Sequence, residues 1–287
     1  PIIYSNQKLL YDALYHAASA TLNELAKDAK YLGANIGYIC ILHTWGSAMN
    51  YHPHIHTIVL GGGLDDENKW KETGGKFFLP YGVISKVFRG KYLDELKSLW
   101  NDSKLKFHGT AEKYQNSYRF KELLDKCYEK NWVTYCKETF NGAQSVINYL
   151  GKYTHRIAIS NHRIKSMTDT TVTYVVKDYK NEGCWKEKTI SGEEFIRRFM
   201  MHVPPKRFVR IRHYGLLSCR NKRKKITHCR NLLGCKKYIS TLKNLNAVEM
   251  IRVLYHIDVC KCSSCGGNMV SPRKDKYSSS FRAHMRC

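Results

Sequence analysis

The sequence predicts an α+β fold with a mainly antiparallel central sheet, flanked by helices. A helical pattern near the N-terminus is followed directly by two strand-like runs separated by turn formers, and a second pair of strand-like runs follows much later. Helices and strands alternate without the βαβ regularity that marks a parallel sheet. With 287 residues, the chain can form one large domain and an appendage.

The first expected helix runs from the capping residue Ser5 to about Lys27, because its apolar residues recur at helical spacing. Gly33 ends it. The runs 38–42 and 55–60 are rich in β-branched, aromatic and aliphatic residues, and the residues between them favour a turn, so together they predict a hairpin.

The later elements follow from the same patterns. We expect strands at 77–79, 132–136 and 208–212, a hairpin of 172–176 with 185–190, and helices over 80–99, 120–130, 143–153 and 192–201. After Gly215 the composition changes, since residues 216–287 hold sixteen Lys and Arg against three acids. The predicted domains are therefore a nuclease-like domain, 1–215, and a basic C-terminal region, 216–287.

A formal net charge of +24 favours a polyanionic partner, with nucleic acid ahead of a membrane. No apolar run reaches the length of a membrane span, and no signal peptide is evident. Seven of the eleven cysteines lie after residue 218, which fits a metal cluster in a reducing compartment better than a disulfide scaffold. We expect a cytoplasmic, nucleoid-associated bacterial protein, and the start at Pro1 indicates a truncated or processed N-terminus.

The expected hairpin carries the first candidate site. His54 and His56 alternate onto one face of the second strand, about 7 Å apart. His43 can lie opposite one of them on the first strand, so that three imidazoles converge as ligands of a divalent metal. His52 shares their face but is expected at the turn, as an ordinary surface residue. The alternative for the pair is a purely structural role on a half-buried strand.

A second candidate site lies in Tyr-Leu-Gly-Lys-Tyr-Thr-His-Arg at 149–156. Tyr149 and Tyr153 share one helix face, and Lys152, His155 and Arg156 supply positive charge. A tyrosine with a pKa near 10 needs such charge, or a metal-organised substrate, to act as a nucleophile. The alternative is a pair of packed structural tyrosines.

These blocks together resemble the HUH endonucleases, and among them the two-tyrosine rolling-circle transposases of the insertion-sequence ninety-one type. The matching blocks occur in the family's order and cover about residues 5–265: His-Thr-Trp-Gly at 43–46, His-Pro-His-Ile-His at 52–56, Gly-Gly-Gly-Leu at 61–64, the tyrosine block with Ile-Ser-Asn at 159–161, and Ile-Arg-His-Tyr-Gly at 211–215. The resemblance implies metal ligands at His54 and His56 and nucleophiles at Tyr149 and Tyr153, with Lys152 in support. It also implies an N-terminal Cys-rich segment, which this chain lacks.

The third ligand has two candidate sources. Similarity to relaxases implies His43, whereas other HUH enzymes use a polar residue on the tyrosine helix, here Gln144 or Asn148. The implied chemistry is cleavage and rejoining of single-stranded DNA at mobile-element ends, with Mg²⁺ or Mn²⁺ polarising the scissile phosphate and tyrosine forming a 5′-phosphotyrosine.

The C-terminal region carries a cationic run and a cysteine knuckle. Arg220, Lys222, Arg223, Lys224 and Lys225 are expected to contact DNA phosphates, as are His155 and Arg156 of the tyrosine block. Cys262 and Cys265, with Cys260 adjacent, form a candidate Zn²⁺ site whose second half is not evident. A replication initiator or relaxase-like nickase remains an alternative function. The non-enzyme alternative is a basic, zinc-binding DNA-binding protein.

Overall fold

The computed structural model describes residues 1–74, 79–137, 143–154, 157–178, 183–235, 242 and 244–269, and for 143–144 and 152–154 it describes the backbone alone. Its contacts divide the chain into two compact units, Pro1–Cys229 and Arg230–Cys287. The predicted functional boundary at residue 215 stays a prediction.

The first unit is built on a four-stranded antiparallel sheet in the order β3-β2-β1-β7. The strands are β1 (Asn35–Trp45), β2 (Tyr51–Leu64), β3 (Trp70–Glu72) and β7 (Ile211–Gly215). The predicted α+β class with an antiparallel sheet is confirmed. The hairpin of β1 and β2 is longer than expected: β2 starts at Tyr51, so His52 lies in the strand rather than at the turn.

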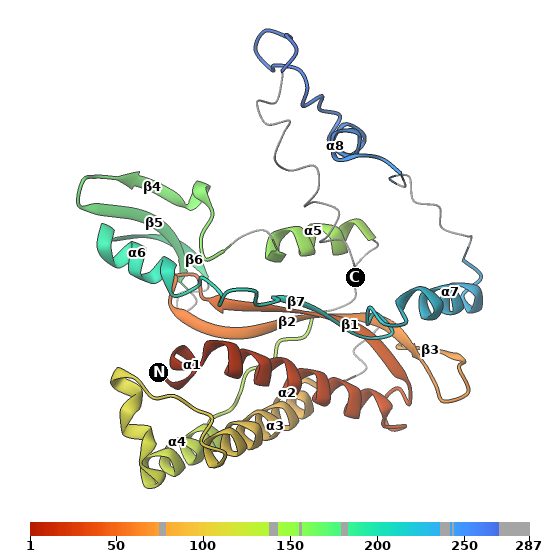
Figure 1. Cartoon of the computed structure of the whole chain (residues 1–287). Coiled ribbons are helices and arrows are strands. Elements are labelled where there is room, and N and C mark those ends of the chain that lie inside the picture. The colour runs from red at the N-terminus through yellow and green to blue at the C-terminus, as the bar shows by residue number, and fades with distance from the viewer. Residues whose placement is uncertain are drawn as a thin grey trace. The chain divides into compact units, whose positions relative to one another are not determined.

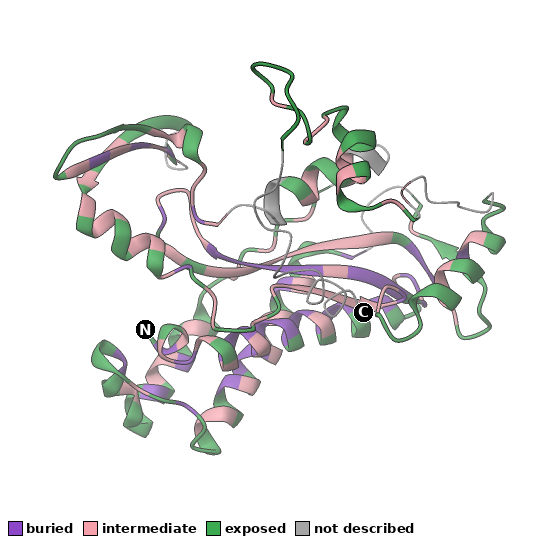
Figure 2. Cartoon of the chain, turned by 45° about the horizontal axis from the view of Figure 1, so that its top comes forward, coloured by how far each residue is buried: buried purple, intermediate pink, exposed green. Residues whose placement is uncertain are grey.

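Helices cover one face of this sheet (Figure 1). The short α1 (Ile2–Ser5) and the long α2 (Gln7–Lys27) pack on β1, and α3 (Tyr81–Asn101) and α4 (Ser117–Glu129) lie beyond α2. The main core lies between the sheet and these helices, where Leu10, Tyr15, Tyr38 and Leu42 are almost fully buried. Figure 2 shows this burial along β1 and the sheet-facing side of α2.

A second sheet, in the order β4-β5-β6, is smaller and antiparallel. It comprises β4 (Ile164–Met167), β5 (Thr171–Asp178) and β6 (Cys184–Ser191), and α6 (Gly192–Met200) follows it. Tyr174 and Val176 of β5 form a small core with Met49 at the turn of the β1–β2 hairpin. The second sheet therefore supports the hairpin at its turn.

Other elements complete the described chain. They are α5 (Ala143–Thr154), α7 (Lys222–Leu232), α8 (Ala247–Tyr255) and the 3-10 turns η1 (Gly109–Gln115) and η2 (Asn161–Arg163). The expected helices and both hairpins are confirmed, except that the first helix begins at Gln7 after Asn6 and Ser5 ends α1 instead of capping it. The elements α1, β3, β4, α7 and α8 were not predicted. None of the helices in the described ranges is both long enough and apolar enough to cross a bilayer.

Two strand predictions need correction. Residues 132–136 form no strand, because the Trp132 ring packs against Phe88 and Tyr92 of α3 and the Trp132 carbonyl accepts a bond from the Ser85 hydroxyl. The strand expected at 208–212 begins instead at Ile211, the first β7 residue to pair with β1. The strand expected at 77–79 falls largely outside the described residues.

Candidate metal and tyrosine site

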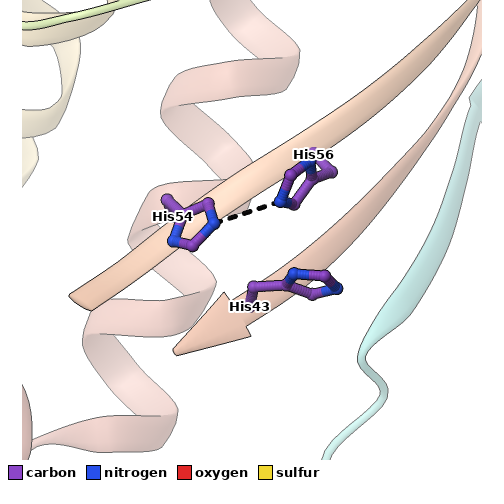
Figure 3. A group of neighbouring side chains, drawn as sticks. All are labelled: His43, His54 and His56. Carbon is purple, nitrogen blue, oxygen red and sulfur yellow. Dashed lines mark hydrogen bonds between the residues drawn. The ribbon is translucent and has the colours of Figure 1, made fainter. Parts of the chain in front are cut away.

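The register of the hairpin brings three histidines together. His43 on β1 is paired directly with His54 on β2, and His56 lies two residues further along on the same face. The ring centroid of His43 lies 5.7 Å from the ring centroid of His54 and 4.4 Å from that of His56. One nitrogen from each ring lies within 4.8 Å of the others, and Figure 3 shows the three rings converging from the two strands. The predicted convergence, including the placement of His43 opposite His54, is confirmed.

A hydrogen bond to a backbone carbonyl determines the tautomer of His54. Its Nδ1 lies 2.6 Å from the carbonyl oxygen of His52, and a carbonyl can only accept, so Nδ1 carries the proton. The Nε2 of His54 therefore presents a lone pair, and it faces the Nε2 of His56 at 3.1 Å. His52 thus contributes through its backbone, a role that residue-type patterns do not reveal.

The environment disfavours the charged forms of His54 and His56. Burial lowers the pKa of His54, and burial together with the nearby His43 and His54 lowers the pKa of His56 to about 3. His43 is buried, with 4% of its surface exposed. Neutral imidazoles are the form that binds a metal ion.

The donor set fits a divalent cation. The three imidazoles offer one nitrogen each, within 4.8 Å of one another, and imidazole nitrogens are common ligands of divalent metal ions. Three imidazoles on one side leave other positions open to oxygen ligands. Among the residues that the structure describes, this is the one group of three or more His, Cys, Asp or Glu side chains arranged to hold a metal.

A tyrosine from α5 reaches this cluster. The Tyr149 hydroxyl lies 3.1 Å from Nδ1 of His56, with the two rings 6.4 Å apart. The contact joins residues that are 93 positions apart in the sequence. Because hydroxyl and imidazole are within hydrogen-bonding distance, the histidine cluster and the tyrosine helix form one site.

The structure describes the other predicted residues near Tyr149 only in part. Tyr153 and Lys152 lie on α5, and so does Gln144, but their side chains are outside the described residues. His155 and Arg156 lie outside the described residues altogether. Asn148 is described, and it is exposed on α5.

The hairpin turn at 46–50 is held from outside by a group of hydrogen bonds that we call the turn clamp. Most of its donors come from the second sheet and α6. The Arg163 guanidinium and the Lys177 amide donate to Ser47, and the Tyr174 hydroxyl and the Arg198 guanidinium donate to the Ala48 carbonyl. His202 Nε2 bonds the Met49 carbonyl. His202 Nδ1 also lies 3.2 Å from the Thr44 hydroxyl, next to His43. The clamp fixes the two strands that present the histidines, and no sequence pattern indicated it.

An aromatic and a cation extend the site along β1. The Trp45 ring stacks on His43 with centroids 4.4 Å apart, and the Arg210 guanidinium lies 5.9 Å from the Trp45 ring. Burial lowers the pKa of Arg210 from its usual range. The cluster therefore has a stacking surface and a positive charge beside it, neither of which was predicted.

The cationic run lies at the start of α7. Arg220, Lys222, Arg223 and Lys224 are exposed, and Lys225 is half-buried. The helix is attached to the sheet, because Cys229 packs with Leu64 and Leu216 and His228 Nε2 lies 3.0 Å from the Asn68 carbonyl. The run therefore projects from a fixed surface of the first unit.

In the second unit, Cys260, Cys262 and Cys265 lie in a tight turn. The Gly266 amide donates to the Cys262 carbonyl at 2.9 Å, and the Cys262 amide donates to the Gly267 carbonyl at 2.8 Å. Backbone amides of Cys265 and Ser264 directed at the Cys262 thiol lower its pKa. Such a turn favours a thiolate, the form of cysteine that binds zinc.

Comparisons with known proteins agree with these features. Residues 37–225 match the model of a family described as "Putative transposase". The chain is 40% identical over 234 residues to "Putative transposase y4qJ" of Sinorhizobium fredii, covering 81% of this chain and 59% of that protein. It is 28% identical over 273 residues to the "Transposase for insertion sequence element IS801" of Pseudomonas savastanoi pv. phaseolicola, covering 94% of this chain and 63% of that protein. The chain thus spans about three fifths of the length of each relative. No solved structure matches it.

Proposed function

Because this chain belongs to the transposase family of the IS91 and IS801 type, we propose that it cleaves and rejoins single-stranded DNA through a tyrosine nucleophile, in rolling-circle transposition. The observation that carries the proposal is the 3.1 Å contact between the Tyr149 hydroxyl and His56. In this proposal, the tyrosine that contacts the three-histidine cluster is the nucleophile, and the basic protein binds the DNA.

His43, His54 and His56 would hold Mg²⁺ or Mn²⁺. When bound, the ion supplies a Lewis acid that polarises the scissile phosphate and compensates the charge that develops on it. Gln144 is the alternative third ligand. The buried position of His43 opposite His54 favours the histidine.

The proton arrangement around His56 supports a role for Tyr149. If His56 coordinated the ion through Nε2, its ring proton would reside on Nδ1 and would be donated to the Tyr149 oxygen, 3.1 Å away. A donated hydrogen bond stabilises the phenolate relative to the phenol, so the tyrosine loses its proton at lower cost. The bond also holds the oxygen at a defined place, which aligns it for attack.

The covalent step is a transesterification. The tyrosine oxygen forms a bond to phosphorus, the bond from phosphorus to the 3′ oxygen breaks, the phenolic proton leaves to solvent, and the 3′ oxygen takes up a proton. The 5′-phosphotyrosine keeps the bond energy, so a later attack by a 3′-OH rejoins the strand without ATP. Tyr153, one helical turn from Tyr149, would serve as the second nucleophile, with Lys152 supplying positive charge.

The DNA would be bound by cations on the first unit and the tyrosine block. Arg220, Lys222, Arg223, Lys224 and Lys225 are the residues proposed to contact phosphates, together with His155 and Arg156. Cys260, Cys262 and Cys265 would contribute ligands to a Zn²⁺ in the second unit, with the remaining ligands elsewhere in the protein. Zinc content measured before and after replacing Cys262 and Cys265 with Ser tests that part.

The test of the proposed activity is formation of a covalent protein–DNA adduct. We expect the protein with Mn²⁺ and a single-stranded oligonucleotide from an insertion-element end to give an adduct that survives denaturing electrophoresis. Tyr149→Phe should abolish or strongly reduce the adduct, and the double variant with Tyr153→Phe should form none. If the double variant still forms the adduct, the tyrosine assignment is wrong. If the protein binds DNA but never nicks it, the non-enzyme alternative is favoured.

A further inference from the structure

A polar cavity lies at the opposite end of the β1–β2 hairpin from the histidines, and we propose that it binds one nucleotide of the DNA strand. The cavity has a volume of about 390 Å³ and lies between α2, the start of β1, the β2–β3 turn, the end of β7 and α7. All its lining residues belong to the first unit. The inference rests on the proposed function in that the ligand is part of the DNA substrate.

Two lysines border the cavity. Lys27 comes from the last turn of α2 and Lys225 from the first part of α7. The one carboxylate in the lining, Asp65, is offset by Lys71, whose Nζ lies 4.0 Å from its Oδ2, and its Oδ1 accepts the backbone amides of Glu67 at 3.0 Å and Lys69 at 2.8 Å. The local charge available to a ligand is therefore positive, which suits a phosphate group.

Asparagines provide the specific polar groups. Asn23 lies one helical turn before Lys27 on the same face of α2, and Asn35 opens β1. The Oδ1 of Asn23 accepts from the Tyr38 hydroxyl at 3.0 Å, and its NH₂ makes a 3.5 Å contact with the Ser19 hydroxyl, which leaves its second amide proton for a ligand. The amide of Asn35 makes only a 3.5 Å contact with the Leu64 carbonyl, so it too can bind a ligand. Amide side chains pair with the donor and acceptor edges of nucleobases.

The floor of the cavity is apolar and fixed. Ile36, Leu64 and Leu216 are buried and line it, so the face of a base can pack on aliphatic side chains. Gly215 also lines it with a positive φ of 58°, and a Cβ there would overlap the Ile36 carbonyl, so only glycine fits this backbone. The bond between His228 and the Asn68 carbonyl holds α7, and with it Lys225, against the β2–β3 turn.

Size and position both fit a nucleotide. A volume of 390 Å³ is at the lower end of the range for small-molecule sites, about 300–1,000 Å³. Ile36 and His43 are seven residues apart on one strand, about 23 Å, so the cavity is separate from the cleavage site. It would therefore hold a nucleotide some distance along the strand from the scissile bond and set the position of the cut.

The test is DNA binding by the full chain in EDTA, where no cleavage occurs. Fluorescence anisotropy with labelled oligo-dT is measured over a range of salt concentrations. Lys27→Ala, at the lining lysine outside the cationic run, should bind more weakly, and its slope of log affinity against log salt should fall by about 0.7, the contribution of one phosphate contact to single-stranded DNA. The matched control is Lys8→Ala, which removes an exposed lysine from the other end of α2 and should leave the slope unchanged.

Competition separates a nucleotide site from a site for phosphate alone. Thymidine monophosphate should displace the oligonucleotide better than inorganic phosphate does, and Asn35→Ala should remove that difference. Equal competition by the two ligands would overturn the nucleotide assignment, and so would a Lys27→Ala variant that behaves like Lys8→Ala. Because binding is measured without metal, these results are independent of the adduct assay. An adduct with no effect of Lys27→Ala refutes the cavity alone, and Lys27-dependent binding without an adduct refutes the tyrosine mechanism alone.

Discussion

Replacement of His202 by Phe tests whether the turn clamp stabilises the hairpin that presents the histidines. His202 is only 2% exposed, and its ring bonds the Met49 carbonyl and the Thr44 hydroxyl, each at 3.2 Å. The carbonyl can only accept, so Nε2 carries the proton and Nδ1 accepts from the hydroxyl of Thr44. Phe fills the same space but leaves both partners without a hydrogen bond.

The expected cost follows from those two partners. Each buried polar group left without its partner costs about 1–3 kcal/mol, and two groups are affected. Burial of the more apolar Phe ring offsets part of that cost. We therefore expect the free energy of unfolding to fall by about 2–4 kcal/mol. Urea unfolding followed by circular dichroism measures it. The control is His16→Phe, since His16 is exposed and its substitution should change the free energy by less than about 0.5 kcal/mol.

The same variant has a defined pH dependence. Burial lowers the pKa of His202 below its ordinary value of 6.5, so the unfolded chain binds this proton more tightly than the folded chain. The stability contributed by the neutral ring is complete above pH 6.5 and is lost as pH falls through and below 6.5 toward the folded-state pKa. The difference between wild type and His202→Phe should therefore narrow on acidification. A cost below about 0.5 kcal/mol at pH 8, or a difference that widens in acid, would refute the reasoning.

Three further predictions concern the strand junction, the metal and the basic run. Gly215→Ala should cost more than about 3 kcal/mol in thermal or urea unfolding, because it adds a clash with Ile36 to a left-handed backbone, whereas Gly74→Ala has open space and should cost only about 1 kcal/mol. Saturating Mn²⁺ at about 100 times its Kd should stabilise the wild type by about 2.7 kcal/mol, and His43→Gln should lose most of this; an unchanged shift would exclude His43 as a ligand. Alanine at the three cations of 222–224 should lower the salt slope of single-stranded DNA binding by up to about 2, and an unchanged slope would show that the run does not contact phosphates.

The local part of the site could be predicted from the sequence, because one hairpin contains it. Alternation places His54 and His56 on one face, and the hairpin allows His43 to lie opposite one of them, but the pairing with His54 is known only from the observed register. The tautomer of His54 could not be predicted in this way. It depends on a backbone carbonyl whose direction only the folded strand defines.

The long-range part needed the structure or a family resemblance. Tyr149 meets His56 across 93 positions, and no periodicity connects the two segments. His202 lies 158 positions from Thr44 in the sequence. A single histidine after a helix forms no motif that would have indicated its contact with the hairpin.

The wrong strand at 132–136 has a similar cause. Trp, Val, Thr and Tyr favour strands, but packing of the Trp132 ring on α3 overrides that preference.

The most direct test of the central claim is to identify the residue that carries the DNA. The full chain is incubated with Mn²⁺ and the single-stranded oligonucleotide, and the adduct is digested with nuclease and trypsin and analysed by mass spectrometry. Trypsin cuts after Lys137 and Lys152, so Tyr149 and Tyr153 fall on different peptides, 138–152 and 153–156. We expect a nucleotide mass on the peptide of Tyr149, with Tyr153 as the second acceptor. A nucleotide on any other peptide, or cleavage of the oligonucleotide without a covalent adduct, would contradict it.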